Sequence, residues 1–279
     1  RPGLEDLPRI DYQQMVWVNV CDYGAVGDGV TFANEAFDRA LAALPPEGGV
    51  IYIPAGIYNF GPPASPSQAF WEPRINNKPL KNVHFVGEGE GTVLRFIKGR
   101  AQAGEAMPYC IRFREAENIS IYNLRFDIRP YLDQRWPPLK PLYPMGFNGV
   151  QGVQVIGVII DQAGMGLSFW SCRDVWVIDC EIRNTGVDGI HFANCVNTVA
   201  AYNYLENLGD DGIAAISTID ELNDTRSVNN RFIYNTVLES VWGRGITVGG
   251  DRCHVEGNWL EQLVMAGIFV NSGGQTGSF

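Results

Sequence analysis

The sequence contains no long apolar run and no block of like charge. No stretch approaches the roughly 18 uninterrupted apolar residues of a membrane helix, and no basic start followed by an apolar segment marks an export signal at Arg1. The chain has 21 basic and 31 acidic residues, which gives a formal net charge of -10. This balance argues against electrostatic binding of nucleic acid. An anionic polymer could bind only through a local basic cleft. We therefore expect neither a membrane nor a nucleic acid as a partner.

The cysteines also lack a familiar pattern. They form neither a C-x-x-C metal motif nor the spacing of a small disulfide scaffold, and they are Cys21, Cys110, Cys172, Cys180, Cys195 and Cys253. We expect most of them to be buried small apolar residues. Cys172 and Cys195 lie 23 residues apart at equivalent positions of the repeat described next, which places them within disulfide range if successive coils stack. Both states stay open, and a reduced pair is favoured.

What the sequence does contain is an internal repeat. Five segments have the form x-Gly-(Leu/Ile)-x-apolar, namely MGLSF (165–169), DGIHF (188–192), DGIAA (211–215), RGITV (244–248) and AGIFV (266–270). Their glycines follow one another at intervals of 23, 23, 33 and 22 residues. A near-constant interval of this length is typical of a solenoid, and the enlarged interval predicts a loop insertion around residues 218–226.

A second repeat runs in register with the first. Its apolar members, at intervals of 23, 32 and 23 residues, are Ile182, Leu205, Val237 and Leu260. Two residues before each of them stand Cys180, Asn203, Asn235 and Asn258. Asparagine at equivalent turns tolerates left-handed backbone angles and can hydrogen-bond to its neighbour in the next coil. The sequence therefore predicts a ladder of turn asparagines.

The repeats predict the fold. Between the turns lie short β-branched or aromatic segments, too short and too regularly spaced for helices. Strands that repeat in one direction every ~23 residues form parallel sheets with a rise near 4.8 Å per coil. We predict an all-β parallel β-helix that forms one domain over residues 1–279, with regular coils over about 150–271. Residues 81–96 and 117–128 predict earlier, less regular coils.

The N-terminal region, about residues 18–60, is predicted to cap this solenoid. Its apolar residues at helical spacing are Phe37, Ala40, Leu41 and Leu44. Pro45 and Pro46 end the pattern. A short amphipathic helix that closes the open end of the coils accounts for this arrangement.

The same region resembles a known superfamily. Residues 18–60 read VNVCDYGAVGDGVTFANEAFDRALAALPPEGGVIYIPAGIYNF, and they resemble the start of the pectin-lyase-like superfamily of right-handed β-helices. The resemblance implies a right-handed parallel β-helix. Because that superfamily contains lyases, hydrolases, epimerases and phage tailspikes, it leaves the chemistry open.

The candidate chemistry comes from three aspartates. Alignment on the glycines puts Asp188 and Asp211 at the same place in successive coils, ~4.8 Å apart along the axis, and Asp210 is beside them. Crowded carboxylates repel one another, which raises some of their pKa values. Glycosidic cleavage needs both a protonated and an ionised carboxyl group, which this cluster can supply. The alternatives are ordinary Asp-Gly turn chemistry and a calcium site.

A more specific resemblance covers this cluster. Residues 184–217, NTGVDGIHFANCVNTVAAYNYLENLGDDGIAAIS, resemble the mycodextranase and α-1,3-glucanase family of β-helical glycoside hydrolases, and more remotely the polygalacturonases. The resemblance implies that Asp210 is the general acid, that Asp188 and Asp211 hold and deprotonate the attacking water, and that the reaction inverts. Polygalacturonases carry a Gly-His-Gly and a later Arg-x-Lys; here Arg244 replaces the histidine and no Arg-x-Lys follows, which favours a neutral glucan.

Several side chains are candidates for substrate contacts. Arg244 aligns one coil beyond Asp211, as an ion-pair partner or a clamp on sugar hydroxyls. His191 alternates with Ile190, so we expect it on the outer face with the acids. Aromatic side chains that could stack on sugars are Trp170 and Trp242 beside the repeat strands, and Tyr131, Trp136 and Tyr143 in the proline-rich segment 130–147. For each of these side chains a structural role is the alternative.

The sequence thus predicts a secreted glycoside hydrolase with no required cofactor that cleaves a polysaccharide or oligosaccharide, an α-glucan, with inversion. Calcium at the aspartates is the cofactor alternative. Rival interpretations are a polysaccharide lyase or epimerase of the same fold, and a non-catalytic, tailspike-like glycan-binding β-helix. The sequence ends at GIFVNSGGQTGSF directly after a coil strand. Because solenoid ends need protection, we expect a second chain or a further C-terminal segment to complete the β-helix.

Overall fold

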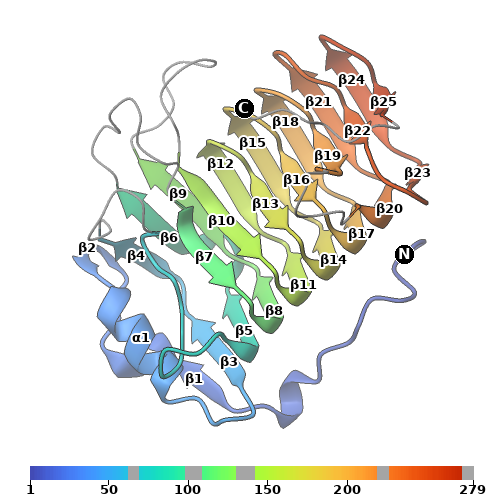
Figure 1. Cartoon of the computed structure of the whole chain (residues 1–279). Helices are drawn as coiled ribbons and strands as arrows, with labels where there is room; N and C mark the ends of the chain where they lie inside the picture. The colour runs from blue at the N-terminus through green and yellow to red at the C-terminus, as the bar shows by residue number, and fades with distance from the viewer. Residues whose placement is uncertain (62–68, 98–108, 130–141, 219–225, 272–279) are drawn as a thin grey trace.

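The chain folds into a right-handed parallel β-helix, as its repeats predict (Figure 1). The computed structural model describes residues 1–61, 69–97, 109–129, 142–218 and 226–271. Strands of successive coils pair in parallel and form three sheets, two of which start near the N-terminus and one of which starts at Tyr109. Three short 3₁₀ helices occur in the N-terminal part, namely η1 (Tyr12–Gln14), η2 (Val20–Tyr23) and η3 (Gly89–Gly91).

Each sheet takes one strand from each of its coils. The first sheet contains, in spatial order, β1 (Trp17–Asn19), β3 (Gly49–Ile53), β5 (Lys81–Gly87), β8 (Glu117–Tyr122), β11 (Gln151–Ile156), β14 (Arg173–Ile178), β17 (Val196–Ala201), β20 (Val228–Ile233) and β23 (His254–Glu256). The second contains β2 (Asp28–Phe32), β4 (Gly56–Phe60), β6 (Thr92–Ile97), β9 (Arg125–Arg129), β12 (Ile159–Ala163), β15 (Glu181–Thr185), β18 (Tyr204–Leu208), β21 (Thr236–Ser240) and β24 (Trp259–Leu263). The third, called sheet C below, contains β7 (Tyr109–Arg114), β10 (Tyr143–Asn148), β13 (Leu167–Trp170), β16 (Ile190–Ala193), β19 (Ile213–Ile216), β22 (Ile246–Val248) and β25 (Ile268–Val270).

The glycine repeat sets the register of sheet C. Ile190 pairs with Ile213, and Ile213 with Ile246, as the alignment on the glycines predicts. Glycine is required there because the coils approach closely: a Cβ atom on Gly189 would stand 2.7 Å from the carbonyl oxygen of Gly212. The enlarged repeat leaves the coil at Ser217 and returns at Ser227, whose N–H donates to the Ser217 hydroxyl at 3.0 Å.

The predicted asparagine ladder is present. The side-chain oxygen of Asn203 accepts the N–H of Cys180 at 2.9 Å, and the side-chain oxygen of Asn235 accepts the N–H of Asn203 at 3.0 Å. Asn258 supports Asn235 in the same way. The expected left-handed angles belong instead to the residues just before these positions, namely Asp179, Tyr202, Tyr234 and Gly257. The asparagine side chains themselves bond to the backbone of the preceding coil.

The core lies inside the coils. Phe113, Phe147, Phe169 and Phe192 stack with ring centroids 4.9, 4.9 and 5.1 Å apart, close to the spacing of paired strands. Helix α1 (Asn34–Ala42), the single α-helix among the described residues, lies at the N-terminal end of the coils (Figure 1). The helix buries its apolar residues Phe37, Ala40 and Leu41 completely. The predicted capping helix is therefore confirmed. This helix is far too short and polar to span a membrane, and the described residues contain no other candidate.

An N-terminal arm, residues 1–16, has no counterpart in the repeat. It runs along the outer side of the first sheet from β20 towards β5 (Figure 1). The Tyr202 hydroxyl donates to the carbonyl of Pro2 at 2.9 Å, and the Gln154 amide donates to that of Pro8 at 2.8 Å. Leu4 and Leu7 pack on an outward-facing apolar cluster, which consists of Trp176, Ile178, Val199, Ala201 and Ile233.

Candidate active site

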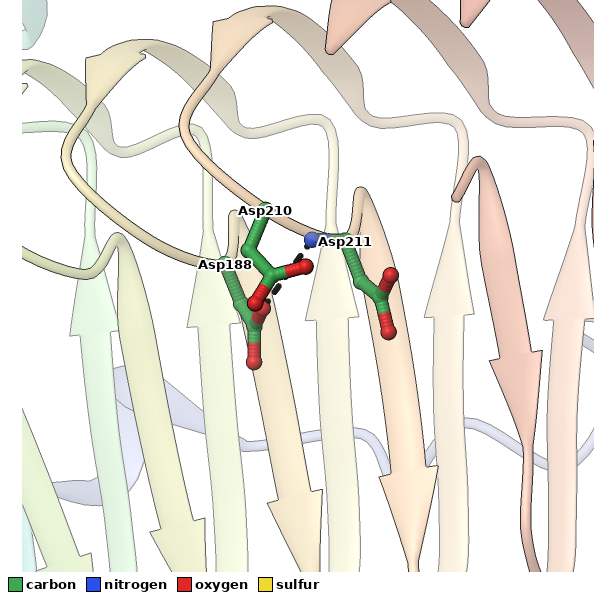
Figure 2. Close-up of side chains that lie close together, drawn as sticks. All are labelled: Asp188, Asp210 and Asp211. Carbon is green, nitrogen blue, oxygen red and sulfur yellow. Dashed lines mark hydrogen bonds between the residues drawn. The ribbon is translucent and has the colours of Figure 1, made fainter. Parts of the chain in front are cut away.

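The coil turns that precede β16 and β19 bring the three aspartates together. The N–H of Gly189 donates to the carbonyl of Asp211 at 2.9 Å, and the N–H of Gly212 donates to that of Arg244 at 2.8 Å. Asp188, Asp211 and Arg244 therefore occupy equivalent positions in three successive coils, as the alignment predicts. In Figure 2 the Asp210 side chain lies beside that of Asp188.

The three side chains form one carboxylate cluster. One oxygen from each of Asp188, Asp210 and Asp211 lies within 4.8 Å of the others. Asp188 and Asp211 are buried, with 8% and 6% of their surface exposed. The cluster is on the outer side of sheet C, because His191 contacts it while the flanking Ile190 and Phe192 point into the core.

Asp188 is held by two hydrogen-bond donors. Its Oδ2 lies 2.5 Å from the Nδ1 atom of His191, and its Oδ1 accepts the backbone N–H of Asp211 at 3.1 Å (Figure 2). A carboxylate oxygen only accepts, so Nδ1 of His191 carries the proton in this contact. Both contacts hold the Asp188 carboxyl group in place.

Asp211 is held by the next coil. Its Oδ1 accepts the backbone N–H of Arg244 at 2.8 Å, and the Arg244 guanidinium lies 3.6 Å from the same atom. Burial raises the pKa of the Asp211 carboxyl, with the Asp188 charge adding to it, while the Thr247 hydroxyl and Arg244 act in the opposite direction. The Arg244 guanidinium also lies over the Phe269 ring, 4.8 Å from its centroid, which fixes its position.

Asp210 differs from its two neighbours in lacking a donor. Its Oδ1 is buried and has no hydrogen-bond partner among the described residues. Burial raises the pKa of Asp210 to about 7, and the charges of Asp188 and Asp211 contribute, with Arg244 and His191 opposing. The cluster therefore contains one carboxyl whose pKa is raised to about 7, beside two carboxyls that accept hydrogen bonds from neighbouring groups.

The donor set fits a calcium ion poorly. Ca²⁺ takes six to eight oxygen ligands, whereas among the described residues the cluster offers three carboxyl groups. The Arg244 guanidinium occupies one side of Asp211 at 3.6 Å and would repel a cation. General acid and base chemistry needs unequal protonation of neighbouring carboxyls, which is what the arrangement provides.

The predicted substrate-contact residues divide into three groups. The rings of His191 and Trp170 have centroids 5.6 Å apart, so both belong to the site. Arg244 contacts Asp211, as an ion-pair partner. Trp242 is 53% exposed in the turn that leads to Arg244, and no ring contact involves it. Trp136 and Tyr131 lie outside the described residues.

Thr247 was not foreseen near the site, and Tyr143, a predicted sugar contact, lies in a strand and not in the expected loop. Tyr143 was expected in a loop, but it begins β10 and is buried against Tyr109, with ring centroids 5.4 Å apart. Burial raises its pKa, and the negative charges of Tyr109 and Asp188 add to the shift. Thr247 faces the Asp211 side of the site and aligns with His191 along sheet C. Reading the repeat for outward positions, as for His191, would have found Thr247.

Cys172 and Cys195 occupy stacked positions outside the acidic cluster. The backbone N–H of Val196 donates to the carbonyl of Cys172 at 3.0 Å, which puts the two cysteines in register. Both are free and fully buried, and burial raises the pKa of the Cys195 thiol. The pair thus resembles an apolar stack.

Fold and site define a right-handed parallel β-helix with a carboxylate cluster on its outer side. Two family models match the chain: rhamnogalacturonase A/epimerase, pectate lyase-like, over residues 17–125, and the right-handed beta helix region over residues 141–277. These matches confirm the superfamily resemblance of residues 18–60.

Individual relatives share this fold. Mannuronan C5-epimerase AlgE1 of Azotobacter vinelandii is 34% identical over 111 residues, which are 39% of this chain and only 8% of that protein. An exopolygalacturonase of Thermotoga maritima superposes with a TM-score of 0.71 at 18% identity, covering 91% of this chain and 68% of the other. A GH87 α-1,3-glucanase of Streptomyces thermodiastaticus gives 0.65 at 23%, covering 90% and 42%. At these identities the structural likeness shows the fold alone.

Proposed function

We propose that the protein is a glycoside hydrolase that cleaves a polysaccharide or oligosaccharide. One observation carries the proposal: Asp210, with a pKa of about 7, lies within a cluster whose other members, Asp188 and Asp211, accept hydrogen bonds. A protonated carboxyl beside ionised ones is the pair of states that glycosidic cleavage requires. The α-1,3-glucanase and the exopolygalacturonase of similar fold support it.

The proposed reaction assigns a role to each carboxyl. Asp210 donates its proton to the glycosidic oxygen as the bond to the anomeric carbon breaks. Asp188 and Asp211 hold a water molecule, one of them takes its proton, and the hydroxide oxygen bonds to the anomeric carbon. The two anions also stabilise the positive charge that develops on the sugar ring. Before the next turnover the base releases its proton to solvent and Asp210 regains one from solvent.

Inversion is the proposed stereochemical course. The resemblance of residues 184–217 to a family of inverting hydrolases supports it, with Asp188 and Asp211 as the proposed holders of the attacking water. The oxygens of the cluster approach within 4.8 Å, which is shorter than the ~6.5–9.5 Å usual between the carboxyl groups of inverting enzymes and nearer the ~5 Å of retaining ones. The anomeric configuration of the first product, followed by NMR, decides between the two courses.

The proposed substrate is a neutral α-glucan, and the proposed location is extracellular. Arg244 is engaged by Asp211 and Phe269, which leaves it poorly placed to bind a uronate carboxylate. The α-1,3-glucanase of similar fold supports this substrate class. Trp170 and Trp242 are 37% and 53% exposed, and an exposed indole can stack on the apolar face of a sugar.

The epimerase relatives favour a second candidate, a lyase or epimerase acting on a uronate polymer. Such an enzyme abstracts a proton next to a carboxylate, so it needs a cation or basic side chains to neutralise that group. Near the cluster the described residues offer Arg244 for this task, which is already paired with Asp211. The hydrolase therefore remains our proposal.

The test is to incubate the purified protein with α-glucans, inulin-type fructans, pectins and alginate, and to follow reducing ends and unsaturated products together. Reducing ends from a glucan without unsaturation support the proposal. Unsaturated products whose formation is inhibited by a chelator would establish the lyase. A change in uronate composition without cleavage would establish the epimerase. Binding of a glycan without turnover would leave a tailspike-like role.

A further inference from the structure

The proposed hydrolase leaves open why Asp210, and not Asp188, keeps the proton of the cluster. The two carboxyl groups lie within 4.8 Å and feel each other's charge. In such a pair a proton can reside on either member. A division into one acid and one base therefore needs a neighbour that distinguishes them.

His191 is the side chain that makes this distinction. Its Nδ1 lies 2.5 Å from Oδ2 of Asp188, and no corresponding donor reaches Asp210, whose Oδ1 has no partner among the described residues. Hydrogen bonds to the charged form favour ionisation. The His191 contact therefore favours ionised Asp188 and leaves Asp210 as the better place for the proton.

The imidazole is fixed in this orientation. His191 is 9% exposed, on β16, and its ring lies 5.6 Å from that of Trp170, with 32° between the two planes. The Trp170 indole N–H donates to the Ser168 hydroxyl at 3.0 Å, which holds the indole in turn. Nε2 of His191 is buried and has no partner among the described residues. Among the described residues, the hydrogen bond to Asp188 is therefore the one that orients the imidazole ring.

The charged and titratable groups around this pair come from three other coils. They are Asp210 and Asp211 before β19, Arg244 before β22 and Tyr143 on β10. Asp211 is already held by Arg244, and Tyr143 is a buried phenol. None of these residues supplies a donor to Oδ2 of Asp188.

We propose that His191 is the positioning residue that keeps Asp188 ionised and thereby leaves the shared proton of the cluster on Asp210. It acts through Asp188 and not on the substrate. This inference rests on the proposed hydrolase, because it assigns the base and the acid of that reaction. It also makes a statement about the imidazole that can be measured without any substrate.

Two amide variants separate this role from a purely structural one. In His191→Asn the side-chain N–H can take the place of the Nδ1 donor, whereas in His191→Gln it lies farther out, near the place of Nε2. On the polymer that the wild type cleaves, His191→Gln should lower kcat about tenfold or more with little change in KM. The acid limb of its pH profile should move upward by about one pH unit, because Asp188 loses a donor to its charged form.

His191→Asn should restore most of the wild-type kcat and the wild-type acid limb. The matched control is His254→Asn: His254 also pairs with a carboxylate, Glu256 at 2.8 Å, but on exposed strand β23, and its loss should change neither value. Thermal unfolding first shows that His191→Gln and the wild type are both folded. Equal pH profiles for the two proteins would then overturn the proposal. Equal losses in the two amide variants would overturn it as well.

NMR of ¹⁵N-labelled histidine tests the same contact without a substrate. The chain has 3 histidines, and Asp188→Asn assigns the His191 signals. Nδ1 of His191 should be protonated in the wild type, and its resonance should move in Asp188→Asn. An unprotonated Nδ1 in wild-type His191 would overturn the proposal. If the wild type cleaves no polymer but Nδ1 is protonated, the hydrolase proposal fails while the His191 contact stands.

Discussion

Asp188, Asp210 and Asp211 carry the same chemical group and differ only in their surroundings. His191 supplies a donor to Asp188 and Arg244 supplies one to Asp211, whereas Oδ1 of Asp210 receives none from the described residues. Burial and like charge raise the pKa of Asp210 to about 7. Ionising this residue in the folded protein is therefore costly at neutral pH, a cost that catalytic sites commonly carry.

This cost predicts a pH-dependent effect on stability. The pKa of Asp210 is raised from an ordinary value of 3.8 to about 7, so the folded state binds more protons than the unfolded state between these values. Stability due to this group is present below pH 4 and is lost as the pH rises towards 7. Asp210→Asn should therefore raise the midpoint of thermal unfolding at pH 8, by about 2 °C or more, and leave it unchanged at pH 3. Asp251→Asn, at an exposed position, is the control, and a lower midpoint for Asp210→Asn at pH 8 would contradict the argument.

The same residue predicts the alkaline limb of the activity. A general acid works only while it is protonated, so kcat/KM on the cleaved polymer should fall as the pH rises through about 7. Initial rates across the pH range measure this limb. An activity that is constant from neutral to pH 9 would mean that another group protonates the leaving oxygen.

At the scale of elements, the turn asparagines link one coil to the next. Asn203 is 1% exposed; it accepts the N–H of Cys180 and donates to the carbonyl of Val177 at 2.9 Å. Asn203→Leu leaves these buried groups without partners, which should lower the free energy of unfolding by about 1–3 kcal/mol. Chemical denaturation measures the loss.

An exposed ladder provides the comparison for Asn203. Asn229 donates to Asn197 at 2.8 Å on the surface, with a left-handed φ of 58°. Glycine accepts that angle, so Asn229→Gly removes only an exposed hydrogen bond. It should lower the free energy of unfolding by no more than about 0.5 kcal/mol. Similar losses for Asn203→Leu and Asn229→Gly would show that burial of the ladder does not matter.

The elements also show how far sequence reasoning reaches. Gly189 and Gly212 fixed the pairing of successive coils in advance, because each stands where the next backbone leaves no room for a side chain. From that register alone, the sequence predicts that Asp188 and Asp211 lie next to each other in successive coils. It could not show which carboxyl lacks a donor, since that depends on how the Asp210 side chain lies. The left-handed turn positions, such as Tyr202, were misplaced by one residue, because an unusual backbone angle at an aromatic has no sequence signal.

At the scale of the whole molecule, the N-terminal arm joins distant coils. Its residues follow no repeat, so no sequence pattern indicates that Leu4 and Leu7 cover outward-facing apolar side chains such as Trp176. Replacing both leucines by serine should cost about 1–3 kcal/mol and increase hydrogen exchange in β14 and β17. The matched control is Leu238→Ser, a partly buried leucine on β21 in another sheet. Unchanged exchange in β14 and β17 would show that the arm does not hold the coils.

The measurement that tests the central claim most directly is the rate of Asp210→Asn on the polymer that the wild type cleaves, beside Asp251→Asn as control. If Asp210 is the general acid, kcat/KM should fall at least about 100-fold while the control keeps the wild-type rate. Full activity in Asp210→Asn would contradict the assignment of the carboxylate cluster as the catalytic site.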